Sequence, residues 1–245
     1  ENVGIRFPSQ KALEIWSDNG GFVDKKSMVV KAPPDLIENA IAHCPPGYDL
    51  CARNPEQDLH LDGNHVYVGT DGCGVEVIDI NTGERRMSCL ADVRDIARIA
   101  DATPEIGFHW VPVSAQDMPP ENRGLFEIKT IWENSTKHVQ TESIYNTSET
   151  KAALEMACVI AGSKESLRKR PVLSLMQCSA PPLGHDGGSL DAAILAAEAG
   201  IPTGFMTMAA NLTTGPATMA GNLVVGNAEV IAATALLQLA FPGAP

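Results

Sequence analysis

The sequence VLSLM at residues 172–176 is followed by SLDAAILAAEA at 189–199, TGFMTM at 203–208 and a long apolar segment at about 217–240. The two short apolar runs are typical of strands, and Gly200 with Pro202 marks the end of the helix expected between them. Strands that are separated by helices pair in parallel, through right-handed crossovers. Neither run alternates polar with apolar residues, so we expect both strands to be covered on both faces. This stretch therefore predicts two strand–helix units of a parallel sheet.

The same rhythm of helix and strand begins upstream, at Ser88. The pattern predicts a helix from Leu90 that ends before Pro104, strands at 106–113 and 137–144, and helices at 121–134 and 150–161. Together these make four strand–helix units, half of the eight that close a barrel of about 250 residues. The predicted fold class is α/β, a (β/α)8 TIM-type barrel that is partial here. An open doubly wound sheet is the alternative, but its Gly-rich GxGxxG turn is absent from the sequence.

Residues 1–87 have a different pattern and form the first expected domain, with 88–245 as the second. Short helices are expected from Ser9 and from Pro34. The period then changes to two, which predicts short strands separated by Asn, Asp, Gly and Pro turns. The expected strands are 48–52, 59–61, 65–69 and 75–80. We interpret this region as a small helical and antiparallel β cap on the barrel units.

The charge of the chain argues against a nucleic-acid partner, and its cysteine content indicates the cellular compartment. With 30 acidic against 18 basic residues and a net charge of −12, the chain lacks the clustered cations that nucleic acids require. Six cysteines without CxxC spacing indicate reduced thiols and a cytoplasmic location. The most apolar helix is interrupted by Gly226, Asn227 and Glu229, so no membrane span is expected. Both ends of the chain suggest that it is cut from a longer polypeptide.

Candidate functional residues follow from the barrel prediction. The reactive face of such a barrel is built from the loops at the C-terminal ends of its strands. We therefore expect functional residues after each of the four expected strands. They are His109 and Gln116 after the first, Glu142 and Tyr145 after the second, Gln177 and Cys178 after the third, and Met206, Met208, Asn211 and Thr213 after the fourth.

Several short motifs resemble the trimethylamine methyltransferase family. They keep the family's order over essentially the whole chain: VGIRF (3–7), ARNPE (52–56), DINTGERR (79–86), LADV (90–93), NSTK (134–137) and FPGAP (241–245). Members are roughly twice this long and fold as (β/α)8 barrels. The resemblance implies transfer of a methyl group from a methylated amine to the cobalt of a separate corrinoid protein. Some members contain pyrrolysine, whereas others, including a glycine betaine methyltransferase, lack it. The position that separates them lies beyond Pro245.

The reaction that the resemblance implies requires a pocket for an amine or ammonium nitrogen, built from aromatic faces or a carboxylate. Glu142 and Tyr145 fit this requirement best, and we expect His109, Gln177 and Met206 to complete a substrate-binding set. Cobalt(I) is itself the nucleophile, so the chain needs no nucleophile of its own. Cys178 and His185 raise a zinc hypothesis, but their spacing matches no standard zinc pattern, and no metal is expected on this chain.

Two other classes of function stay open at this stage. The chain could be an incomplete fragment or degenerate paralogue that acts only as an interaction module, or an unrelated barrel lyase or metal-dependent hydrolase. Because a half barrel exposes unpaired strand edges, we expect the isolated chain to form homo-oligomers.

Overall fold

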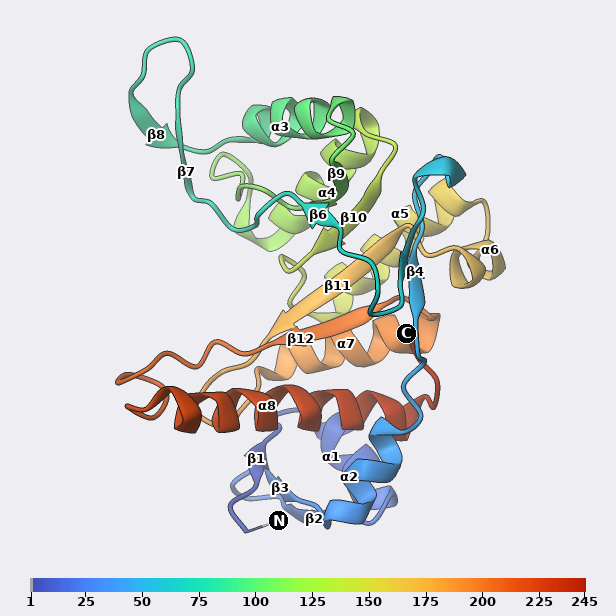
Figure 1. Ribbon diagram of the computed structural model, residues 1–245, viewed down its shortest axis with the longest axis vertical. Helices are drawn as coiled ribbons and strands as arrows, with labels where there is room; N and C mark the ends of the chain where they lie inside the picture. Colours follow the sequence, from blue (N-terminus) through green and yellow to red (C-terminus); the bar gives the residue numbers. More distant parts are fainter. Residues whose placement is uncertain (1) are drawn as a thin grey trace. The chain divides into compact units, whose positions relative to one another are not determined.

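The computed structural model describes residues 2–245 and divides into two compact units (Figure 1). The first unit contains the chain up to Pro46, Tyr145–Thr147 and Met176–Pro245. The second contains Gly47–Ile144 and Ser148–Leu175. Each unit therefore draws on sequence from both sides of residue 88.

The main sheet has five strands in the order β12-β11-β10-β9-β6. These are β6 (Val68–Gly69), β9 (Ile106–Trp110), β10 (His138–Thr141), β11 (Leu173–Cys178) and β12 (Thr203–Met206). The pairings of β6 with β9, β9 with β10 and β10 with β11 are parallel. The four strands expected from the sequence are confirmed, and the sheet is compatible with a partial α/β barrel.

The fifth strand, β6, corrects one expectation. The sequence predicted an antiparallel cap strand at 65–69, but Val68 pairs in parallel with Ile106. A run of two paired residues contains no local signal for its direction, because direction is set by the partner strand. The antiparallel prediction does hold for the hairpins β4 (Tyr48–Leu50) with β5 (Leu59–Leu61) and β7 (Glu76–Ile78) with β8 (Arg85–Met87).

Helices of the second unit follow the strands in the expected order. They are α3 (Leu90–Ala102), α4 (Arg123–Asn134), α5 (Thr147–Ala161, beginning in the first unit) and the short α6 (Lys164–Lys169), with 3-10 turns η1 (Pro55–Gln57) and η2 (Pro120–Asn122). Asp92 caps α3 by accepting a hydrogen bond from the Cys89 N–H at 2.8 Å. Ser163 is the N-cap residue of α6, and its hydroxyl accepts a hydrogen bond from the Ser166 N–H at 3.0 Å.

The first unit packs around the long helix α8 (Met219–Ala240), which contacts α1 (Gln10–Asp18), α2 (Pro34–Ile41) and α7 (Gly187–Ala199) (Figure 1). A small antiparallel sheet, ordered β1-β3-β2, completes the unit; its strands are Ile5–Arg6, Val29–Lys31 and Phe22–Asp24. The apolar core of this unit includes Phe7, Trp16, Leu190 and Leu236.

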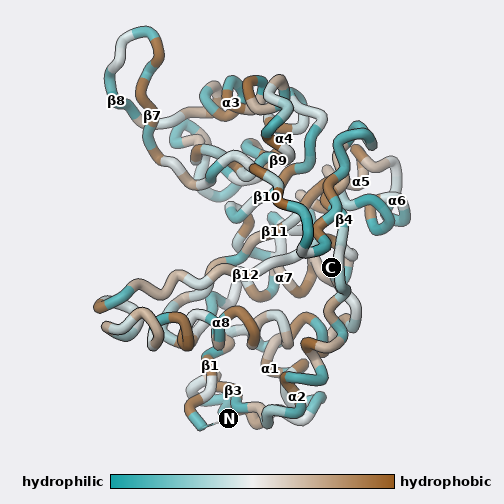
Figure 2. Tube along the Cα trace, viewed as in Figure 1, coloured by the Kyte–Doolittle hydropathy of each residue, from teal (hydrophilic) through white to brown (hydrophobic). Residues whose placement is uncertain are grey.

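Helix α8 is long and apolar enough to cross a membrane by length and composition alone. Figure 2 shows apolar residues recurring along it. Its buried residues Ala235, Leu236 and Leu237 belong to the apolar core just described, and Glu229 is also buried. These contacts account for the apolar residues in the C-terminal half of α8, whereas Met219, Leu223 and Val224 near its start are exposed.

The C-terminal end of α7 forms as the sequence predicted, and the helix begins at Gly187, two residues before the expected start at Ser189. The Asp186 carboxylate accepts a hydrogen bond from the Ser189 N–H at 2.9 Å and so caps the first turn. Gly200 ends the helix in the left-handed conformation, with φ of 80°. These caps fix where the loop after β11 ends and where the chain turns towards β12.

Candidate functional site

In the second unit, an acidic and an aromatic side chain meet near the ends of β9 and β10. Glu142 directly follows β10 and is 8% exposed, and the Cys73 thiol donates a hydrogen bond to its Oε1. A Cβ added to Gly72 would lie 2.7 Å from Nε1 of Trp110 and 2.8 Å from Oε1 of Glu142. The Trp110 indole and the Glu142 carboxylate therefore border the same glycine, and only the missing side chain of Gly72 leaves them this space.

The loop after β6 holds this arrangement together. The Trp110 N–H donates to Thr70 Oγ1 at 2.9 Å, and the Thr70 hydroxyl donates to the Trp110 carbonyl. Further along, the Ser114 N–H donates to the Gly74 carbonyl at 2.7 Å. The loop thus runs beside the end of β9 and brings Gly72 and Cys73 to Glu142.

Trp110 was not singled out from the sequence because it lies within an expected strand. Side chains alternate along a strand, so Trp110 points to the opposite face from His109. Its Nε1 is buried and, in the described part of the chain, has no hydrogen-bond partner. A carboxylate beside an aromatic ring is a combination that attracts an organic cation.

His109 lies on the other face of β9, among buried polar groups. It is fully buried, with its Nε2 2.6 Å from Ser135 Oγ, and Ser135 in turn donates to Asp101 at 2.8 Å. Burial lowers the pKa of His109 to about 4, so its ring is neutral near pH 7. Contact between His109 and substrate stays a prediction, whereas Trp110 is the residue of β9 that borders Glu142.

A second buried acid anchors the loop after β9. Glu127 of α4 is fully buried and accepts a hydrogen bond from the Ala115 N–H at 2.8 Å. Burial raises the pKa of this carboxyl. Gln116 lies in the same loop and donates from its side chain to the Ser114 carbonyl at 3.2 Å.

The other nominated residues lie in the first unit. Gln177 is buried near the end of β11, and Met206 is half-buried at the end of β12. The two strand ends are joined where the Ser179 N–H donates to the Met206 carbonyl at 2.9 Å. Tyr145 is 54% exposed, and its backbone carbonyl closely approaches Gly188 of α7. Glu142 thus belongs to one unit, and Tyr145, Gln177 and Met206 to the other.

Sequence reasoning missed the acid at the centre of this second group. Glu229 of α8 is fully buried, and its carboxylate accepts hydrogen bonds from Ser179, Leu183 and Thr207. In the sequence, Glu229 stood out only as a charge within an apolar helix. A lone acid in such a helix is a signal for a buried polar network.

The two residues behind the zinc hypothesis do not belong to a metal cluster. Nε2 of His185 lies 3.1 Å from the Glu229 carbonyl, and its ring stacks on Phe7. Burial lowers the pKa of His185. Across residues 2–245, no group of three or more His, Cys, Asp or Glu side chains is arranged to hold a metal ion.

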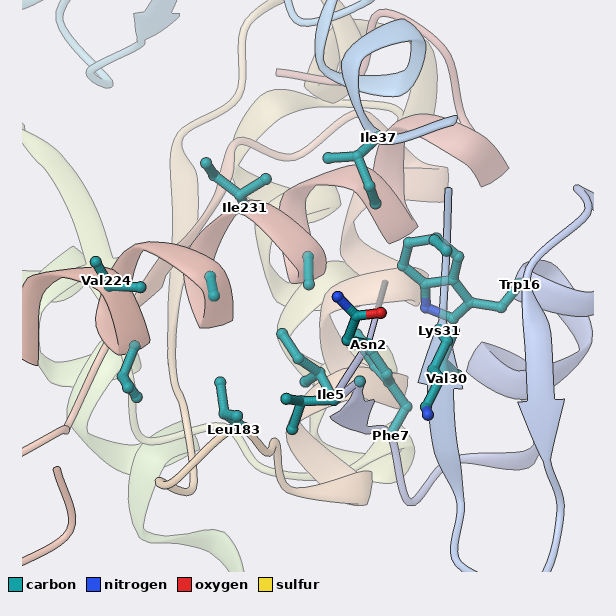
Figure 3. Close-up of a pocket in the computed structure, with 16 residues that line it drawn as sticks. Asn2, Ile5, Phe7, Trp16, Val30, Lys31, Ile37, Leu183, Val224 and Ile231 are labelled. Carbon is teal, nitrogen blue, oxygen red and sulfur yellow. The ribbon is translucent and has the colours of Figure 1, made fainter. Parts of the chain in front are cut away.

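A separate apolar cavity of about 450 Å³ lies within the first unit (Figure 3). Figure 3 shows Ile5, Leu183 and Ile231 around it. Among the described residues that line it, the charged one is Lys31 and none is a carboxylate. The Lys31 ammonium group repels a cationic ligand, and the described lining residues supply no carboxylate to offset it.

Comparison with known proteins assigns the family. The family model described as trimethylamine methyltransferase (MTTB) matches residues 1–245. The chain belongs to the trimethylamine methyltransferase family. Within this family, a trimethylamine methyltransferase MttB of Desulfitobacterium hafniense is 37% identical over 245 residues, which cover 100% of this chain and 49% of that protein.

Two further relatives differ from this one in their named substrate or their source organism. A glycine betaine methyltransferase of Desulfitobacterium hafniense (strain Y51) is 30% identical, with 100% of this chain and 50% of that protein covered. The trimethylamine methyltransferase MttB1 of Methanosarcina acetivorans is 29% identical, with 99% and 50% covered. The chain therefore spans about half the length of the curated relatives that it matches.

Proposed function

We propose that the full-length protein carrying this chain is a methyltransferase that moves a methyl group from a tertiary or quaternary methylated amine to the cobalt of a corrinoid protein. In this reaction the methyl C–N bond breaks, the amine leaves with that electron pair, and cobalt(I) supplies the pair for the new bond to carbon. Family membership over the whole chain supports the reaction class, with relatives named for trimethylamine and for glycine betaine.

The single observation in the structure that favours this function is the pairing of Trp110 with Glu142 around Gly72. A methylated ammonium ion offers a positive charge and no strong directional hydrogen bond from its methyl groups. A carboxylate and an aromatic face stabilise such a charge without needing directed donors. We infer that these two groups hold the nitrogen and thereby orient the methyl group that is transferred.

Substitution of either group should weaken amine binding. We expect Glu142→Gln and Trp110→Ala each to raise KM for the amine by roughly 5- to 30-fold, the equivalent of about 1–2 kcal/mol. The turnover number should change less, because the contact is made before as well as during transfer. Steady-state kinetics of amine-dependent corrinoid methylation measures both constants.

Matched variants separate this effect from loss of fold. Trp110→Phe keeps an aromatic face and should bind better than Trp110→Ala. Glu133→Gln removes an exposed acid that pairs with Lys129 on α4, and should leave KM unchanged. Equal KM values for wild type, Glu142→Gln and Trp110→Ala would remove these residues from the substrate site.

Other parts of the proposal rest on the sequence. Substrate contact by Tyr145, Gln177, Met206 and His109 stays a prediction, as does a cytoplasmic location. Self-association is supported by the outermost strands β12 and β6, which pair on one side only within the described sheet order. The corrinoid is proposed as a group carried by the partner protein.

A further inference from the structure

The carboxylate of Glu229 connects helix α8 to two different loops of the first unit. It accepts a hydrogen bond from Ser179 Oγ at 2.6 Å and from the Leu183 N–H at 2.8 Å, both in the segment after β11. It also accepts from Thr207 Oγ1 at 2.7 Å, in the segment after β12. One side chain therefore binds the two segments that follow adjacent strands.

The two hydroxyl groups extend this contact to the backbone. Ser179 Oγ accepts a hydrogen bond from the Met208 N–H at 3.0 Å, and Thr207 Oγ1 accepts from the Ala209 N–H at 3.1 Å. Each hydroxyl thus accepts from a backbone amide and donates its own proton to Glu229. The direction of all these hydrogen bonds is fixed by the carboxylate, because an ionised carboxylate only accepts.

A glycine in α8 allows this helix to approach the segment after β12 closely. Gly226 lies one turn before Glu229, and a Cβ added to it would come within 2.7 Å of the Thr207 methyl carbon. A glycine inside a helix destabilises that helix relative to alanine. Its presence here allows the helix to lie against Thr207 and so brings Glu229 within reach.

A fully buried acid is a costly way to fill space in an apolar core. The three hydrogen bonds to the Glu229 carboxylate come from neutral donors, two hydroxyls and one amide. An apolar side chain at this position could stabilise the fold equally well, because replacing a buried polar network with well-packed apolar groups often leaves the free energy of unfolding unchanged. The network is better explained by a need to hold these loops in one geometry.

We propose that Glu229 is a positioning residue for methyl transfer, which fixes the segments after β11 and β12 so that Gln177 and Met206 keep their orientation at the strand ends. Gln177 lies two residues before Ser179, and Met206 directly precedes Thr207. The inference rests on the proposed methyltransferase function and adds to it a residue that acts through the loops, without touching the substrate.

Substitution of Glu229 by Gln tests the proposal with little change in volume. The amide has a single acceptor oxygen, so it cannot accept from Leu183 and from both hydroxyls as the carboxylate does. We expect kcat/KM of the full-length enzyme to fall by about 100-fold, as for a misplacement of about 1 Å in a reacting geometry. We also expect faster amide hydrogen exchange at Leu183, Met208 and Ala209, measured without substrate or corrinoid protein.

Three further variants separate positioning from loss of stability. Thr207→Val removes one hydroxyl at nearly constant volume and should lower kcat/KM, whereas Thr207→Ser keeps the hydroxyl and should retain it. Leu236→Ala creates a cavity in the core next to α8 and should lower the thermal midpoint. Its kcat/KM per folded enzyme should stay at the wild-type value.

The outcomes are distinct. Unchanged exchange in both loops of Glu229→Gln would overturn the inference, and so would wild-type kcat/KM in a variant whose loops exchange faster. A kinetic loss in Leu236→Ala equal to that in Glu229→Gln would reduce Glu229 to a stabilising residue. An inactive wild-type enzyme would instead contradict the proposed function, while the exchange measurement would still report on the loops.

Discussion

Acidification from pH 6.5 to pH 4 is expected to lower the free energy of unfolding by about 3 kcal/mol for each of two buried histidines. Burial lowers the pKa of His109 and of His138 from 6.5 to about 4. His138 is fully buried, and its ring nitrogens each lie 2.9 Å from a partner oxygen, the Cys51 carbonyl and Ser174 Oγ. Both rings are therefore neutral in the folded chain over most of this range.

The free energy of unfolding falls with pH because the folded and unfolded chains bind different numbers of protons. Above pH 6.5 both forms are neutral and stability does not depend on these groups. Between pH 6.5 and 4 the unfolded chain takes up protons that the folded chain does not, so the folded state loses stability as pH falls. Urea unfolding at a series of pH values measures this loss.

Substitution at the two sites shows whether the histidines cause the effect. His138→Gln should unfold more easily at pH 7, but its stability should depend less on pH than that of the wild type. A slope that His138→Gln leaves intact would show that folding does not lower the pKa of His138.

Replacement of Gly188 by Ala should destabilise the first unit by about 3 kcal/mol, the upper end of the range for overpacking. The added methyl would lie 2.2 Å from the Tyr145 carbonyl oxygen, a backbone atom that cannot rotate away. Gly188 is the second residue of α7, where alanine would otherwise favour the helix by about 1 kcal/mol. The expected loss is therefore opposite in sign to the helix propensity. Thermal or urea unfolding measures it.

Gly20→Ala is the matched control. Gly20 has a φ of 92°, and no atom lies within 4 Å of an added Cβ. The alanine variant should therefore be destabilised only by the left-handed backbone conformation, by about 1–2 kcal/mol. If Gly188→Ala proved as stable as the wild type, the contact between Tyr145 and the start of α7 would be looser than the structure shows.

Much of the fold was predictable because its signals are local. Strand β11 is a buried and mainly apolar run, and the C-terminal end of α7 is set by Gly200 directly after its last residue. The direction of β6 was not predictable, because it depends on pairing with β9, far away in sequence.

The candidate site was predicted only in part, for the same physical reason. Glu142 was proposed from the sequence because its position after a strand can be read from the chain. Trp110 was missed because its relation to Glu142 depends on Gly72, which belongs to a different strand's loop. Glu229 was missed because its partners Ser179, Leu183 and Thr207 lie 50, 46 and 22 residues away. Family membership then decides against the alternative of an unrelated barrel lyase or hydrolase.

The most direct test of the proposed reaction is the absorbance of the corrinoid when full-length protein, reduced corrinoid protein and a methylated amine are mixed. We expect methyl-cobalt to form with trimethylamine or a quaternary amine such as glycine betaine, and only when both the enzyme and the amine are present. The Glu142→Gln enzyme should need more amine to reach the same rate. Absence of methyl-cobalt with every methylated amine, using a corrinoid protein already shown to accept methyl groups, would contradict the proposed function.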